Sequence, residues 1–137
     1  MPNSVALCDD GSLIMNLWML AGGLMVLICA AGHAIAGWNM FYRPIKSALR
    51  SELQAGVFTG IWHLITIHFA LSAIALLTLG IHGRGDALAW LIAAQFAGYA
   101  AAYLVISLRL GGPLMLFQWV PFGATALLGA LAAIAMP

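Results

Sequence analysis

The chain has 137 residues, of which 64% are hydrophobic and only 7% are charged. Soluble domains carry about a quarter of charged residues, so this chain cannot cover a globular surface with polar groups, and we expect it to lie in a lipid bilayer. The formal net charge of +1 argues against the strongly basic surface that nucleic-acid binding requires.

Four uncharged stretches are long enough to cross a bilayer. A hydrocarbon core of about 30 Å takes roughly 20 apolar residues in a helix. The sequence therefore predicts transmembrane helices near residues 14–41, 56–81, 87–108 and 113–135. The connections are short, which favours an antiparallel up-down four-helix bundle. We take residues 1–137 as a single integral membrane domain of an all-α membrane protein.

Basic residues predict the orientation, because Lys and Arg collect in cytoplasmic loops. Arg43, Lys46 and Arg50 lie between the first two predicted helices, and Arg109 lies between the last two. The acidic N-terminus lacks the positive region of a cleaved signal peptide. We therefore expect a multi-pass protein of a bacterial-type inner membrane with both termini non-cytoplasmic.

Two prolines predict where further helices begin. Pro44 is expected to open a short helix in the plane of the interface, with Ile45, Leu49 and Leu53 facing lipid. Pro113 follows a pair of glycines and is expected to start the fourth helix at its first turn.

Small residues at four-residue spacing predict where helices touch, because membrane helices associate through close fit. Gly56 and Gly60 form such a pair in the second predicted helix. The third carries two rows, which together make one smooth face: Ala93, Ala97 and Ala101, and Ala94, Gly98 and Ala102. One row could meet a neighbouring helix and the other a second subunit, so a homo-oligomer, a larger membrane complex and a single tight bundle all remain open.

Histidines and other polar side chains fall within the predicted spans. His33 and His63 lie at similar depth, His63 roughly 9 Å from the cytoplasmic start of its helix, and His68 lies deeper. Polar groups are costly in hydrocarbon, so we expect them to face the interior of the bundle. The other members of this polar layer are Cys29, Gln95, Tyr99, Tyr103 and Gln118.

Three interpretations of the layer remain open. The first is structural: the side chains join the helices by hydrogen bonds, as expected of a non-enzymatic accessory or interaction subunit. The second is a haem or copper site that uses His33 with His63 or His68. His63 and His68 are five residues apart, about 140° around a helix, so they cannot bind one ion together. The third is a proton or small-molecule path, although no carboxylate lies within a span.

An enzymatic role is disfavoured. The predicted spans contain no paired carboxylates, and no Ser/His/Asp arrangement is recognisable, so we assign no catalytic residue. The two cysteines have no CxxC or similar partner, so we assign no metal-binding motif.

Two segments, "GHAIAGW" (residues 32–38) and "IWHLITIHF" (residues 61–69), resemble a pattern in small bacterial inner-membrane proteins of unassigned function. Those proteins have four predicted spans, a GH motif in the first helix, and a Trp-His motif near the start of the second. The resemblance rests on Gly32, His33, Trp62 and His63. A glutamate often follows the first motif, where this chain has Trp38. The resemblance implies a four-span membrane protein and no particular activity.

Overall fold

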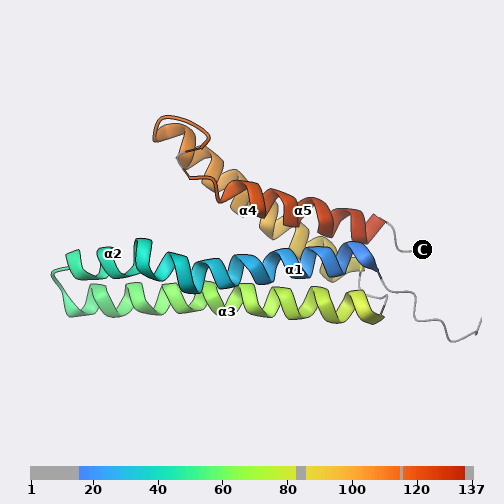
Figure 1. Cartoon of the computed structure of the whole chain (residues 1–137), viewed down its shortest axis with the longest axis horizontal. Helices are drawn as coiled ribbons and strands as arrows, with labels where there is room; N and C mark the ends of the chain where they lie inside the picture. Colours follow the sequence, from blue (N-terminus) through green and yellow to red (C-terminus); the bar gives the residue numbers. More distant parts are fainter. Residues whose placement is uncertain (1–15, 83–85, 115, 135–137) are drawn as a thin grey trace, which may run out of the picture.

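The computed structural model describes residues 16–82, 86–114 and 116–134, and every regular element among them is a helix (Figure 1). The elements in chain order are α1 (Leu17–Gly32), η1 (His33–Tyr42), α2 (Arg43–Ala48), α3 (Glu52–His82), α4 (Asp86–Arg109) and α5 (Trp119–Ile134). Three helical segments in this part of the chain are long and apolar enough to cross a membrane: Leu17–Ala48, Glu52–His82 and Ala87–Arg109. The expected all-helical fold is thereby confirmed, and the lengths and apolar composition of these segments are compatible with a membrane protein. A fourth apolar helix, α5, has only 16 residues.

The first helix does not stop before Pro44. α1, η1 and α2 form one helical segment of 32 residues, so the predicted separate interfacial helix is wrong. η1 is a π-helix, in which the N–H of Arg43 donates to the carbonyl of Trp38, five residues earlier. A proline ring collides with the carbonyl four residues before it in a regular α-helix. The wider π turn moves that carbonyl aside, and the helix continues past Pro44.

α1 and α3 lie side by side, with the start of α1 against the end of α3. A Cβ atom on Gly23 would lie 2.7 Å from Cγ of Leu77, and one on Gly80 would lie 2.9 Å from Cγ of Leu20. Both positions therefore need glycine, because any larger residue would push the helices apart. The backbone N–H of Asn16 donates to the carbonyl of Gly80 over 2.8 Å and closes this end of the pair.

α5 joins the other helices at the same end. Gly129 packs against Ala93 of α4, where an added Cβ would approach the alanine Cβ to 3.1 Å. Asn16 Nδ2 donates to the carbonyl of Ala132 over 3.0 Å, and Asn16 Oδ1 accepts from the N–H of Met19 and caps α1. One buried asparagine thus joins α1, α3 and α5.

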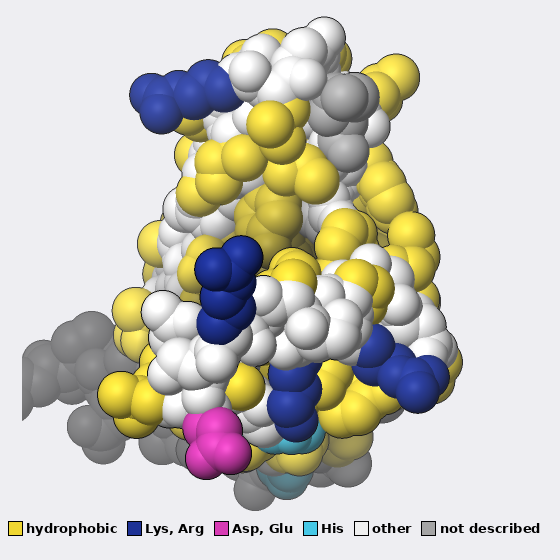
Figure 2. All heavy atoms as spheres, turned by 90° about the vertical axis from the view of Figure 1, so that its left-hand side faces the viewer, with side chains coloured by type: hydrophobic (Ala, Val, Ile, Leu, Met, Phe, Trp, Pro, Cys, Tyr) yellow, Lys and Arg dark blue, Asp and Glu magenta, His cyan; other side chains and the backbone are white. Residues whose placement is uncertain are grey.

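At the opposite end the two helix pairs diverge. α4 and α5 turn away from the long α1–α3 pair (Figure 1). Seen from that end, hydrophobic side chains line a hollow between the two pairs (Figure 2). The helices therefore pack closely at the end that contains Asn16 and separate toward the end that contains Arg43 and Arg109.

The connection between α4 and α5 corrects the second proline prediction, because α5 begins at Trp119 and not at Pro113. Gly111 and Gly112 adopt positive φ angles of 117° and 155°, which end α4. The buried Ser107 hydroxyl donates to the carbonyl of Gly112 over 2.7 Å and accepts from the N–H of Leu116 over 2.9 Å. These bonds hold the segment in a turn, which leaves α5 too short to span about 30 Å of hydrocarbon without distortion.

Candidate functional site

His68 is the centre of a hydrogen-bonded group between α3 and α4. Its Nε2 lies 2.6 Å from Nε2 of Gln95, and the same amide nitrogen donates to the hydroxyl of Tyr99 over 2.9 Å. The Ser72 hydroxyl is 3.5 Å from Nε2 of His68. An amide nitrogen is a donor, so the imidazole Nε2 is the acceptor in this contact. The structure thus joins three of the predicted polar residues into one link between helices.

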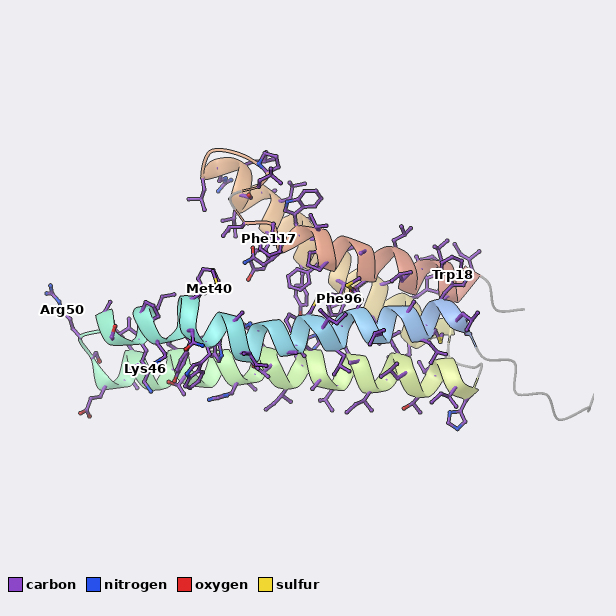
Figure 3. The ribbon with its side chains drawn as sticks, viewed as in Figure 1. Trp18, Met40, Lys46, Arg50, Phe96 and Phe117 are labelled. Atoms are coloured by element: carbon purple, nitrogen blue, oxygen red, sulfur yellow. The ribbon has the colours of Figure 1, made fainter. Side chains whose placement is uncertain are left out.

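Three phenylalanines from different helices pack beside this group. Phe69 of α3, Phe96 of α4 and Phe122 of α5 have ring centroids 5.5–5.8 Å apart. Figure 3 shows Phe96 at the place where the two helix pairs meet. This cluster was not predicted from the sequence, although Phe69 and Phe96 each directly follow a polar residue of the layer. Aromatic rings of this size separate the helix axes more than the glycines at the other end do.

His33, the first residue of η1, packs against α3. Its ring stacks on the Trp62 indole with a centroid distance of 4.0 Å, and its Nε2 lies 3.3 Å from the Trp62 carbonyl oxygen. The Phe69 ring meets it edge-on at 5.9 Å. The half-buried imidazole therefore has both an aromatic and a hydrogen-bonding partner on α3.

His63 does not face the interior, contrary to the prediction. Trp62 and Phe69 are seven residues apart and both are buried against the first helical segment. His63 follows Trp62, so its side chain lies about 100° further around α3 and is exposed. Its nearest ring neighbours are Trp38 at 6.3 Å and Tyr42 at 6.5 Å.

The contacts that the histidines make within the protein compete with the predicted haem or copper site. His33 and His63 have different neighbours, and Nε2 of both His33 and His68 already faces a protein group. An axial or metal ligand would first have to give up these contacts. Within residues 16–82, 86–114 and 116–134, no group of three or more His, Cys, Asp or Glu side chains could hold a metal ion. The contacts of the imidazoles fit links between helices better than ligands to a shared ion.

The remaining residues of the predicted layer are dispersed. Cys29 packs against the hydrophobic core, and the Tyr103 ring lies 5.5 Å from that of Phe122. Oε1 of Gln118 is buried and has no hydrogen-bond partner in the part of the chain that the structure describes. These three side chains do not join the His68 group.

The two small-residue rows of α4 have different environments. Ala93 is buried against α5, whereas the outer face of α4 is exposed, and no atom lies within 4 Å of a Cβ placed on Gly98. Gly56 and Gly60 on α3 are likewise open, with no described atom within 4 Å of an added Cβ. We call the exposed set the α4 small-residue face: Ala94, Ala97, Gly98, Ala101 and Ala102.

Comparisons with protein-family models, with curated proteins and with solved structures returned no match. The contacts and surfaces of the chain itself are therefore what supports a function.

Proposed function

We propose that this chain is a non-enzymatic accessory subunit of a bacterial-type inner membrane, which docks on another transmembrane helix through the α4 small-residue face. In this proposal the four helices form an antiparallel up-down arrangement with both termini non-cytoplasmic. The basic ends of α2 and α4 then lie at the cytoplasmic surface, where Lys and Arg collect.

The hydrogen bonds that polar side chains form between helices support a structural role for the layer. His33 contacts Trp62, and His68 contacts Gln95, in each case across two helical segments. Interhelical hydrogen bonds of this kind contribute about 0.6–1.7 kcal/mol each in a membrane. They fix the register of neighbouring helices.

The α4 small-residue face carries the proposal. Between membrane helices there is no hydrophobic driving force, so association depends on close van der Waals contact, which Gly and Ala allow. Gly98 and its alanine neighbours form such a surface, yet none of the residues that the structure describes covers it. A second helix could approach α4 here as closely as α5 approaches it at Ala93.

Site-specific photo-crosslinking in native membranes tests the docking. We expect a photoreactive residue at Ala97 to give a discrete protein adduct, and one at Ala31, an exposed alanine of α1, to give none. Gly98→Leu should abolish the adduct, whereas Gly32→Leu, at another open glycine, should not. Mass spectrometry of the adduct identifies the partner or a second copy. Equal adducts at Ala97 and Ala31, or only lipid adducts at both, would refute the proposal.

Cysteine accessibility tests the orientation separately. Ser47 and His82 are exposed at opposite ends of the long helix pair. In a background without Cys8 and Cys29, His82→Cys should react with an impermeant maleimide in intact cells, and Ser47→Cys only after permeabilisation. The reverse pattern would invert the topology and leave the docking face untouched.

A further inference from the structure

An open recess lies on the flank of the η1–α2 segment. It has a volume of about 420 Å³ and is lined by Trp38, Tyr42, Arg43, Lys46 and Ser47. The Trp38 and Tyr42 rings are stacked at 4.1 Å. Lys46 Nζ donates to the Tyr42 hydroxyl over 3.1 Å and lies 5.4 Å from the centre of that ring. The recess therefore combines an aromatic wall with two cationic side chains.

The depth of the recess places it at a membrane surface. Trp18 and Trp38 are 20 residues apart on one helical segment, which corresponds to about 30 Å and matches the hydrocarbon core. Tryptophans at that separation belong to the two interfacial aromatic belts. Arg43 and Lys46 lie one to two turns beyond Trp38 and so reach the layer of lipid phosphates.

Charge at this end is mainly positive, although Glu52, the first residue of α3, also lies there. All of the Lys and Arg residues that the structure describes, Arg43, Lys46, Arg50 and Arg109, lie at this end (Figure 2), and Figure 3 shows Lys46 and Arg50 there. No carboxylate among the described residues forms an ion pair with Arg43 or Lys46, and the Trp38 indole N–H has no hydrogen-bond partner in the same part of the chain. Two cations and one N–H donor beside the same recess are therefore available to a ligand.

We infer that this recess binds the headgroup of an anionic phospholipid. Its phosphate would lie between Arg43 and Lys46 and accept the indole N–H of Trp38, while the acyl chains continue into the bilayer along the helix. Basic residues with interfacial aromatics are the chemistry by which membrane proteins hold acidic headgroups. A lipid fits better than free phosphate, because the aromatic wall lies at the boundary where glycerol and acyl chains begin. The inference does not depend on the docking of α4.

Native mass spectrometry of the detergent-purified protein tests this site. We expect one molecule of phosphatidylglycerol to remain bound, and phosphatidylethanolamine at equal concentration to bind at least tenfold more weakly. Each Lys or Arg near an anionic lipid surface contributes about a fivefold factor in affinity, so Arg43→Gln with Lys46→Gln should weaken binding about 30-fold. The matched control, Arg50→Gln with Arg109→Gln, removes the same charge from the same end and should retain the lipid.

Three results would overturn the inference. Equal loss in both double variants would mean diffuse attraction without a site, and retention in Arg43→Gln/Lys46→Gln would mean that the lipid binds elsewhere. Displacement of the lipid by millimolar inorganic phosphate would mean that the recess recognises the phosphate ion alone. Lys46 also contacts Tyr42, so that double variant could lose stability. Arg43→Gln alone has no such contact and should still weaken binding about fivefold.

Discussion

Replacing Gly23 by alanine should destabilise the protein specifically through the α1–α3 contact. The new Cβ would lie 2.7 Å from Cγ, 2.9 Å from Cδ2 and 3.0 Å from the backbone nitrogen of Leu77. The side chain can rotate, but the backbone nitrogen can yield only if α3 moves. Overpacking of this kind costs about 1–3 kcal/mol. Alanine also favours the helix over glycine by about 0.5–1 kcal/mol, which partly hides the cost.

Gly32→Ala is the matched control, because it gains the same helix propensity in the same element and no atom lies within 4 Å of its new Cβ. Unfolding in mixed detergent micelles should therefore show Gly23→Ala to be less stable than Gly32→Ala by about 1–3 kcal/mol. The double variant Gly23→Ala/Leu77→Ala should lose less than the sum of its single variants, because it removes the side-chain part of the collision. Equal stability of the two glycine variants would show that α1 and α3 do not approach as closely as described.

Three further predictions use the same unfolding measurement. Asn16→Asp keeps the oxygen that caps α1 but replaces the donor to the Ala132 carbonyl with an acceptor. It should therefore lower the free energy of unfolding by at least about 1 kcal/mol, the contribution of one interhelical bond. A stability equal to that of the parent would contradict the junction of three helices at Asn16. His68→Ala should lower the free energy of unfolding by about 1–2 kcal/mol, and His63→Ala by less than about 0.5 kcal/mol. The reason is that, of these two histidines, His68 forms a hydrogen bond to another helix whereas the His63 side chain is exposed. The opposite order of stabilities would show that His63 faces the interior. Ser107→Ala should cost about 1–3 kcal/mol, because its buried hydroxyl bonds two backbone groups of the α4–α5 turn, whereas Ser47→Ala, at an exposed residue, should have little effect.

The helices could be predicted from the sequence because each is a long uncharged run, and lipid tolerates few other backbone structures. The predicted range 56–81 lies within α3, and the range 87–108 lies within α4. The proline predictions failed because they depended on the local backbone. A π turn carries the first segment past Pro44, and the Ser107 hydroxyl holds a turn that delays α5 to Trp119. Neither feature has a periodic sequence signature.

The polar layer could be predicted only as a depth and not as a set of contacts. His68 and Gln95 were both predicted as members of one polar layer, and the structure brings their side chains together. Depth in the membrane does not determine the direction in which a side chain points around its helix. His63 shares the depth of His33, yet the buried face of α3 passes through Trp62 and Phe69 and leaves His63 outside. A helical projection anchored on the large aromatic residues would have identified that face.

The size of the residues at each level explains why the two ends of the molecule differ. At the Asn16 end the contacts are made by Gly23, Gly80 and Gly129, so α1 approaches α3, and α5 approaches α4, until backbone and side chain touch. At the middle, the rings of Phe69, Phe96 and Phe122 meet between α3 and the α4–α5 pair and hold the two pairs further apart. Beyond that level the two pairs diverge (Figure 1). At that end the recess beside Arg43 and Lys46 is open, so an anionic lipid can reach the cations that no described carboxylate neutralises.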